Sequence, residues 1–287
     1  MATGLQLFAL TADGPRALKA DSSGASVHDL LEELPDGVYS ALRTFHHDRF
    51  LRLDAHCDRT DRSMAGLGWN RKLDRETLSS ALDATVRAYP LPDARVRFDV
   101  LREPFELQGI RSDVFLALSP FVPVSAEFVR DGVGVDVARH LRRETPRVKT
   151  TGFVRARKPL PLGTQQQFES LLLDADDRIL ECTSANIGFV RDGAIVAADD
   201  GVLEGITSLI LRGLAPQIGL AWEHERLPLR DLGRVQEAFL TSSSRGIVPV
   251  VRAAGVTIGD GRVGPRVRSL IEAYAAFAER AARPAID

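Results

Sequence analysis

Four short segments in the second half of the sequence carry side chains that could support one connected kind of chemistry. The first holds Lys149, a primary amine that can form an imine with an aldehyde when its site favours the neutral amine. The second holds Glu181, a carboxylate that could keep a heteroaromatic nitrogen protonated. Two polar turns follow, Gly205-Ile206-Thr207 and Ser242-Ser243-Ser244, which offer hydroxyls and backbone N–H groups to an anion.

The anion that these turns suit is a small phosphate ester. Gly205-Ile206-Thr207 stands where a helix is expected to begin, and the first N–H groups of a helix carry a partial positive charge. Arg59 could add a fixed cation, because guanidinium binds phosphate bidentately and stays protonated. The glycine patterns of nucleotide-binding loops are absent from the sequence. An aldehyde, a pyridine nitrogen and a phosphate together describe pyridoxal 5'-phosphate, which is the cofactor that the sequence predicts.

Each of these residues also has an ordinary structural alternative. Taken alone, Lys149 and Arg59 could be solvated surface residues, and Glu181 could be a strand-end glutamate in solvent. Thr207 could simply begin a helix, and a serine triplet is most often a loop. The order and spacing of the segments, rather than any one of them, favour a shared site.

Composition describes a globular chain without an obvious nucleic-acid or membrane partner. Of the 287 residues, 44% are hydrophobic and 26% charged, and the net charge is −2, which provides no basic field. The start lacks the basic region of a signal peptide, and no run approaches the ~18 apolar residues of a membrane span. Cys57 and Cys182 fit neither a disulfide framework nor a metal site. We expect a cytoplasmic protein that binds no nucleic acid, membrane or metal.

Hydrophobic patterning predicts an α+β chain with two domains. In the first half we expect strands at 38–45 and 50–53, followed by two helices that begin after the capping residues Asp54 and Asp74. Two more strands should follow at 95–101 and 114–118. Two prolines within 120–124 predict a linker, which separates an N-terminal domain (1–120) from a C-terminal domain (125–287) across residues 121–124. The second half should contain strands at 133–137, 238–241 and 247–251, two strands within 187–196 on either side of a turn at 191–193, and helices at 208–214 and 266–282.

This pattern resembles the class IV aminotransferases, the pyridoxal phosphate enzymes of fold type IV. They include branched-chain and D-amino acid aminotransferases, R-selective amine transaminases and aminodeoxychorismate lyase. The motifs that match are Gly37-Val38-Tyr39, His56-Cys57-Asp58-Arg59, Lys149, Glu181 to Asn186, Gly205-Ile206-Thr207 and Thr241 to Pro249. The resemblance implies a smaller N-terminal α/β domain, a larger β-rich C-terminal domain, the cofactor at their interface, and a homodimer.

The resemblance also implies a role for each matching residue. Lys149 would bind the cofactor covalently and carry the proton between the substrate Cα and the cofactor C4′. Glu181 would hold the pyridine nitrogen. Arg59, the Ile206 and Thr207 amides, the Thr207 hydroxyl and Ser243 would hold the phosphate, and Ser243 and Ser244 would help to bind the substrate carboxylate.

Several positions depart from the family pattern. The tyrosine that branched-chain enzymes carry after the lysine is missing from Gly152-Phe153-Val154, and their Phe-Glu-Gly is replaced by Tyr39-Ser40-Ala41. The functional threonine of the lyase would fall at Ala41, and Cys182 replaces a common glycine.

Three residues on expected strands are candidates for binding the substrate. Tyr39, Arg43 and Arg97 lie on strands that should line the substrate side, and either arginine could pair with a carboxylate. The alternative for both arginines is a solvated or structural role.

The sequence therefore predicts an aminotransferase that moves an amino group between an amino acid and a 2-oxo acid, with a D-amino acid favoured over a branched-chain L-amino acid. Two alternatives remain open. One is β-elimination of the aminodeoxychorismate lyase type, which would release pyruvate without a second keto acid. The other is a non-catalytic protein that binds a phosphorylated metabolite and would show no borohydride-sensitive absorbance band.

Overall fold

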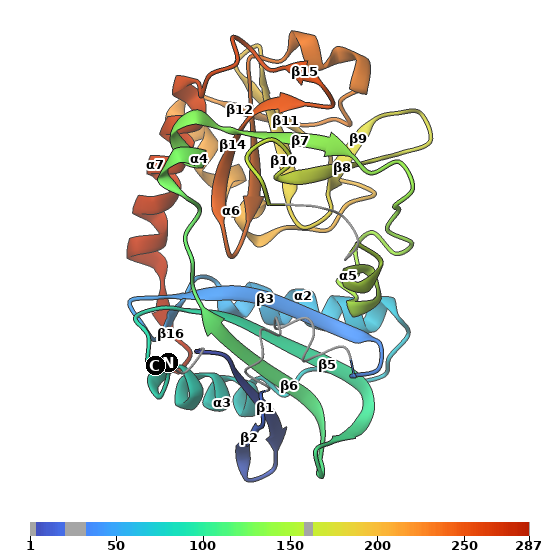
Figure 1. Ribbon diagram of the computed structural model, residues 1–287, viewed down its shortest axis with the longest axis vertical. Helices are drawn as coiled ribbons and strands as arrows, with labels where there is room; N and C mark the ends of the chain where they lie inside the picture. Colours follow the sequence, from blue (N-terminus) through green and yellow to red (C-terminus); the bar gives the residue numbers. More distant parts are fainter. Residues whose placement is uncertain (1–3, 21–32, 158–162, 287) are drawn as a thin grey trace. The chain divides into compact units, whose positions relative to one another are not determined.

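The computed structural model describes residues 4–20, 33–157 and 163–286. The chain divides into two compact units (Figure 1). The first unit holds Met1–Val122, Val148–Arg155 and Glu279–Asp287, and the second holds Pro123–Arg147 and Ala156–Ala278. The first passage between the units falls inside the segment 121–124, where we expected a linker, and the chain then returns twice to the first unit.

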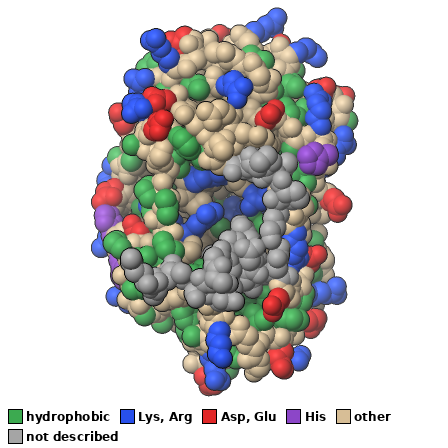
Figure 2. Space-filling model, in the orientation of Figure 1, with side chains coloured by type: hydrophobic (Ala, Val, Ile, Leu, Met, Phe, Trp, Pro, Cys, Tyr) green, Lys and Arg blue, Asp and Glu red, His purple; other side chains and the backbone are tan. Residues whose placement is uncertain are grey.

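Basic and acidic side chains are interspersed over the visible face of each unit (Figure 2), which agrees with a net charge close to zero. None of the described helices is long and apolar enough to cross a membrane.

The described part of the first unit is built on a seven-stranded antiparallel sheet with the order β16-β4-β3-β5-β6-β1-β2. Its strands are β1 (Gln6–Thr11), β2 (Gly14–Leu18), β3 (Gly37–Phe45), β4 (Arg49–Phe50), β5 (Ala94–Leu107), β6 (Ile110–Pro120) and β16 (Arg283–Pro284). The expected strands at 38–45, 95–101 and 114–118 are confirmed as parts of β3, β5 and β6. The β1–β2 hairpin was not predicted.

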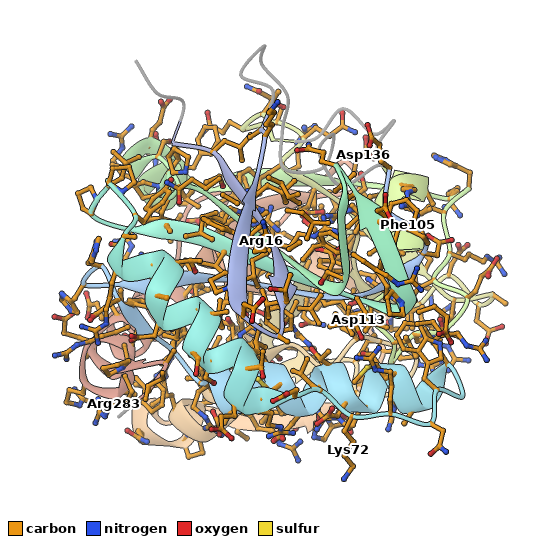
Figure 3. All side chains as sticks on the ribbon, turned by 90° about the horizontal axis from the view of Figure 1, so that it is seen from below. Arg16, Lys72, Phe105, Asp113, Asp136 and Arg283 are labelled. Atoms are coloured by element: carbon orange, nitrogen blue, oxygen red, sulfur yellow. The ribbon has the colours of Figure 1, made fainter. Side chains whose placement is uncertain are left out.

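Two helices, α2 (Leu53–Gly66) and α3 (Arg75–Arg87), cover one face of this sheet (Figure 3). Asp74 caps α3 as expected, because its side chain accepts a hydrogen bond from the Thr77 N–H at 3.0 Å. The expectation that Asp54 caps α2 is wrong. Arg52 is the N-cap in a left-handed conformation (φ 54°), and this backbone turn ends the preceding strand at Phe50 and starts the helix at Leu53.

The pairing of β3 with β5 sorts their side chains onto opposite faces. Tyr39 lies opposite Asp99, and Ala41 lies opposite Arg97. Val38 and Phe98, which alternate with these residues, belong to the core beneath α2 and α3. The face that carries Tyr39, Arg97 and Asp99 is therefore the one turned away from the helices.

The segment around Lys149 is attached to β3 by its backbone. The Tyr39 N–H donates to the Lys149 carbonyl at 3.0 Å, and Thr150 forms an isolated bridge with Val38. The Gly37 N–H donates to Thr151 Oγ1 at 2.9 Å, just where the short helix α5 (Thr151–Arg157) begins. These contacts explain why Val148–Arg155 belongs to the first unit, although the residues just before it in the sequence belong to the second.

The described part of the second unit is built on a nine-stranded mixed sheet with the order β12-β11-β10-β13-β14-β7-β8-β9, and β15 pairs with β14. Its strands are β7 (Val133–Val137), β8 (Glu169–Leu173), β9 (Ile179–Cys182), β10 (Asn186–Arg191), β11 (Ala194–Ala197), β12 (Ala221–His224), β13 (Glu237–Ser242), β14 (Gly246–Ala253) and β15 (Val256–Thr257). Its helices are α4 (Ala126–Asp131), α6 (Ile206–Leu214) and α7 (Pro265–Ala281), with 3-10 turns η1 (Ala215–Ile218) and η2 (Leu229–Arg234).

Most elements expected in the second half are confirmed, namely β7, the β10–β11 hairpin, β13, β14 and α7. Helix α6 begins at Ile206, two residues before the expected start, so Ile206 and Thr207 form its first turn. Strands β8 and β12 were not predicted.

Candidate active site

In the first unit, Lys149 is brought together with two of the expected substrate-binding residues. Its amine nitrogen lies 4.6 Å from the centre of the Tyr39 ring. The guanidinium carbon of Arg97 lies 4.5 Å from the centre of the same ring. An amine and a guanidinium therefore border one aromatic side chain, on the sheet face turned away from α2 and α3.

Arg97 is held in a fixed orientation by Asp99, two residues along β5. Its Nε donates to Asp99 Oδ2 at 2.7 Å and its Nη2 to Oδ1 at 2.5 Å, which is the bidentate geometry of an arginine–carboxylate pair. Both residues are buried. Burial raises the pKa of the Asp99 carboxyl, and the charge of Arg97 opposes that shift. The result is a cation that is preorganised on the strand.

Arg43, the other candidate clamp, has different neighbours. Its guanidinium carbon lies 3.8 Å from the centre of the Phe45 ring and 4.2 Å from that of Phe121. Of the two arginines, Arg97 is the one that shares an aromatic neighbour with Lys149.

Arg59 lies on α2 against the opposite face of β3, where it contacts Ser40 and His56. Its Nη2 donates to Ser40 Oγ at 3.0 Å and lies 3.4 Å from His56 Nδ1, and Ser40 Oγ lies 2.8 Å from that nitrogen. Burial, followed by the charges of Arg59 and Lys149, lowers the pKa of His56 well below its ordinary value. His56 is therefore neutral at physiological pH, and two neutral side chains orient the Arg59 guanidinium.

In the second unit, Glu181 lies on β9 and is buried. Its Oε1 accepts hydrogen bonds from Arg143 Nε at 2.9 Å and from the Leu203 N–H at 3.3 Å, and its Oε2 accepts one from Asn186 Nδ2 at 3.3 Å. Three donors thus fix the orientation of this carboxylate. Arg143 was not singled out from the sequence, because its partner is distant in the chain.

Asn186 connects Glu181 to the loop that leads into α6. Besides contacting Glu181, its amide donates to the Leu203 carbonyl at 2.8 Å. A Cβ placed on Gly205 would lie 1.8 Å from Asn186 Oδ1, so only glycine permits this approach. Asn186 thus fixes the carboxylate of Glu181 with respect to the first turn of α6.

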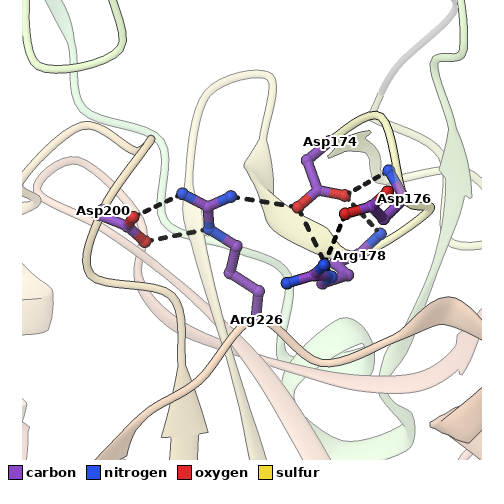
Figure 4. Close-up of polar contacts among 5 residues, drawn as sticks. All are labelled: Asp174, Asp176, Arg178, Asp200 and Arg226. Atoms are coloured by element: carbon purple, nitrogen blue, oxygen red, sulfur yellow. Dashed lines mark hydrogen bonds and ion pairs between the residues drawn. The ribbon is translucent and has the colours of Figure 1, made fainter.

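The loop before α6 is also tethered from its outer side. Arg226 donates to Asp200 in this loop at 3.0 and 2.6 Å and to Asp174 in the β8–β9 turn at 3.1 Å (Figure 4). At the N-terminus of α6, Gly205 provides no side-chain cap for the first N–H groups, and Ile206 and Thr207 are buried. Backbone donors at a helix start are suited to a phosphate.

The β13–β14 turn carries Ser243 and Ser244, both half-buried. At its entrance, Thr241 lies opposite Asn186 in the sheet, so their side chains share a face. Thr241 Oγ1 is buried and has no hydrogen-bond partner within the described residues. Because buried hydroxyls are normally paired, this position fits a site that a ligand completes.

The two cysteines are packing residues. Cys182 is fully buried in the core of the second unit, and burial raises its pKa well above the ordinary value. Burial likewise raises the pKa of Cys57 to about 11. Both are free, buried thiols, and nothing in the structure explains Cys182 in place of the family's glycine. Across the described ranges, no group of three or more potential metal ligands comes together.

A model of the family described as amino-transferase class IV matches residues 37–253, which is most of the chain. The chain is a class IV aminotransferase. The D-alanine aminotransferase of Listeria innocua serovar 6a is 26% identical to it over 266 residues, covering 87% of this chain and 89% of that protein. The branched-chain-amino-acid aminotransferase of Pseudomonas aeruginosa is 25% identical over 257 residues, covering 83% of this chain and 82% of that protein.

Solved structures confirm the expected fold type IV architecture. The branched-chain aminotransferase of the archaeon Thermoproteus uzoniensis, solved with norvaline, is similar to this aminotransferase with a TM-score of 0.76 at 21% identity, covering 98% of this chain and 99% of that chain. Family and relatives together make the aminotransferase a transaminase that depends on pyridoxal phosphate.

The donor set of this aminotransferase fits that cofactor. The Lys149 amine suits the aldehyde, and the Glu181 carboxylate, oriented by Arg143, suits a protonated pyridine nitrogen. The oriented Arg59 guanidinium and the uncapped start of α6 suit the phosphate.

The buried His56 makes the stability of the folded protein depend on pH. Its pKa in the folded protein lies well below 6.5, so when the pH falls below 6.5 the unfolded chain binds a proton that the folded chain does not. This contribution to stability is therefore complete above pH 6.5 and is lost below it, at about 1.4 kcal/mol per pH unit.

Chemical unfolding of the apo-protein at several pH values above and below 6.5 measures this slope. His56→Gln should reduce the slope by about 1.4 kcal/mol per pH unit, whereas a variant of the exposed His140 should not change it. Equal slopes for the wild type and His56→Gln would contradict a buried neutral imidazole.

Proposed function

We propose that this aminotransferase moves an amino group between an amino acid and a 2-oxo acid, and that its preferred donor is a D-amino acid. The observation that carries the proposal is that Lys149 and Arg97 border the same Tyr39 ring. A carboxylate bound by Arg97 would hold the reacting carbon of a small amino acid near the Lys149 amine. Holding both reactants in this way is a large part of catalysis by proximity.

The ion pair on this sheet face supports a substrate with a carboxylate there rather than an aliphatic side chain. Tyr39, Arg97 and Asp99 all lie on it, and the last two are a buried ion pair. A carboxylate packed against this pair can accept a hydrogen bond from the Arg97 guanidinium, whereas an aliphatic side chain cannot. The similarity to the Listeria D-alanine aminotransferase points the same way. The branched-chain relatives make an L-amino acid of that class the competing donor.

The β-elimination alternative receives no support from the same face. Ala41, at the position of the lyase's functional threonine, lies opposite Arg97 and carries no hydroxyl. Transfer to a second keto acid is therefore the reaction that we propose.

In this proposal, each residue has one task. Pyridoxal phosphate supplies the electron sink when it is bound. Lys149 carries the proton between the substrate Cα and the cofactor C4′, and Glu181 keeps the pyridine nitrogen protonated. The phosphate is held by Arg59, the Ile206 and Thr207 amides, the Thr207 hydroxyl and Ser243. The substrate carboxylate is bound by Arg97, Tyr39 and Ser244.

The assembly and location of the protein also remain predictions. A homodimer is what the family resemblance implies, and light scattering on the purified protein would measure it. A cytoplasmic location is proposed from the composition.

Replacing Arg97 should weaken the binding of substrates that carry a carboxylate and should not affect substrates that lack one. Arg97→Lys keeps the charge but loses the planar fork that Asp99 orients. We expect KM for D-alanine to rise by about tenfold to a hundredfold, which corresponds to a loss of roughly 1.4 to 2.7 kcal/mol of carboxylate binding. The rate with R-phenylethylamine, which has no carboxylate, should change little. Half-reaction kinetics, which follow loss of the cofactor's visible absorbance band, measure both substrates.

The exposed Arg102, on the same strand, provides the matched control, because Arg102→Lys should leave both substrates unaffected. An equal loss of rate for D-alanine and for R-phenylethylamine in Arg97→Lys would contradict carboxylate binding by Arg97. Faster half-reactions with L-leucine than with D-alanine in the wild type would reject the proposed donor preference.

Replacing Glu181 should slow proton transfer without preventing cofactor binding. In Glu181→Gln the amide can still accept hydrogen bonds from Arg143 and Leu203, but it cannot keep the pyridine nitrogen protonated. We expect the half-reaction to slow on the order of a hundredfold, while the cofactor remains bound. Glu223→Gln, on the exposed face of β12, is the control that should behave as the wild type. Unchanged half-reaction rates in Glu181→Gln would remove Glu181 from the proposed mechanism.

A further inference from the structure

A second buried carboxylate, Glu169, lies at the start of β8 and takes no part in the proposed chemistry. It is fully buried. Its Oε2 accepts a hydrogen bond from Thr183 Oγ1 at 2.6 Å, and its Oε1 accepts one from Ser184 Oγ and another from Arg245 Nη2 at 2.8 Å. A charge is removed from water at this position and is compensated by one arginine and two hydroxyls.

Arg245 contacts two separate turns at once. Its Nε and its backbone N–H both donate to Ser242 Oγ, at 3.2 and 3.3 Å, within its own β13–β14 turn. Its Nη2 reaches the β9–β10 turn, where it donates to Ser184 Oγ at 2.8 Å and to the Ser184 carbonyl at 3.2 Å. The guanidinium also lies 5.2 Å from the centre of the Phe168 ring. One side chain thus joins the two turns to each other and to Glu169.

These two turns are the ones that flank the proposed ligand contacts of the second unit. Strands β10 and β13 are antiparallel neighbours, with Asn186 opposite Thr241, so the β9–β10 and β13–β14 turns leave the sheet at the same end. The first turn lies between Glu181 and Asn186. The second carries Ser243 and Ser244.

From these contacts we infer that Arg245, oriented by Glu169, is a positioning residue that holds the Ser243–Ser244 turn in the conformation that binds the anionic groups of cofactor and substrate. This inference rests on the proposed function. Arg245 acts through the turn and need not touch either ligand.

The β13–β14 turn is closed by the backbone pairing of Ser242 with Gly246, and Arg245 is the side chain that joins it to the β9–β10 turn. Ser242, Ser243, Ser244 and Gly246 are all half-buried and carry no apolar side chain that could anchor them in the core. The backbone N–H groups and hydroxyls of a binding turn must keep their direction, since a displacement of ~1 Å can cost about a hundredfold in rate. A planar fork with several donors can hold two turns in register, whereas an ammonium group at the same place neutralises Glu169 without reaching both.

The direction of the pKa shift of Glu169 agrees with an ion pair to Arg245 in the folded protein. Burial alone would raise the pKa of Glu169, but the charge of Arg245 and the hydroxyls of Ser184 and Thr183 outweigh it and lower the pKa below the ordinary value. Removing Arg245 alone would leave a buried carboxylate without its cation, which destabilises a protein for reasons unrelated to the turn. The test therefore needs variants that keep this charge balanced.

Two variants satisfy that condition. Arg245→Lys keeps a cation beside Glu169 but loses the fork. The double variant Glu169→Gln with Arg245→Met removes both charges, and the amide of Gln can still accept hydrogen bonds from Thr183 and Ser184. Arg234→Met, at an 81% exposed side chain on η2, is the control for the loss of an arginine. For each protein we would measure the melting temperature of the apo-protein, the dissociation constant of pyridoxal phosphate, and kcat and KM for the amino donor.

We expect both variants to melt close to the wild type and to bind pyridoxal phosphate about tenfold more weakly, which is the loss of roughly one oriented hydrogen bond to a charged group. KM for a D-amino acid should rise by about the same factor, and kcat should change less. If either charge-balanced variant folds and retains wild-type cofactor affinity and KM, the inference is overturned, because the turn then binds its ligands without support from Arg245. If the double variant does not fold, Arg245→Lys decides in the same way.

Failure of the inference about Arg245 and failure of the proposed function would give different results. A wild type that binds pyridoxal phosphate but transfers no amino group from any amino acid would reject the proposed reaction. Cofactor affinity in the variants would still report on the turn, because Ser243 lies within it.

Discussion

The backbone hydrogen bond from Tyr39 to Lys149 is the interaction on which the chemistry of the first unit depends. It is 3.0 Å long and, with the bridge between Val38 and Thr150, attaches the segment that carries Lys149 to the start of β3. Because the pairing uses backbone groups, it places Lys149 beside Tyr39 whatever the neighbouring side chains are. The register of β3 with β5 then sets Asp99 opposite Tyr39 and Arg97 on the same face.

Each unit also contains buried carboxylates that are paired with an arginine. Arg97 with Asp99, Arg143 with Glu181 and Arg245 with Glu169 are ion pairs formed within one unit. Each pair fixes the orientation of its guanidinium and its carboxylate. The contribution of a buried ion pair to stability is small by comparison, because both charges are removed from water. Arg59 differs, because a hydroxyl and the neutral imidazole of His56 orient it. A cation presented in this way is suited to the phosphate of the cofactor.

The sequence predicted the elements whose formation depends on residues close to one another in the chain. The alternation of β3 and β5, the Asp74 cap and the amphipathic helix α7 were all confirmed. Arg143 and Arg245 were missed because their partners lie 38 and 76 residues away, and no local pattern marks an arginine that will pair with a distant buried carboxylate. The start of α2 was misplaced because a left-handed residue, Arg52, sets it rather than the side chain of Asp54.

The central claim is that Lys149 is the residue that binds pyridoxal phosphate covalently. It is most directly tested by borohydride reduction of the cofactor-loaded protein, followed by proteolysis and mass spectrometry of the lysine-containing peptides. The account predicts a pyridoxyl label on Lys149, absent from Lys149→Ala and retained when the exposed Lys72 is replaced by alanine. A label on Lys158, which lies outside the described residues, with Lys149 unmodified, would contradict it.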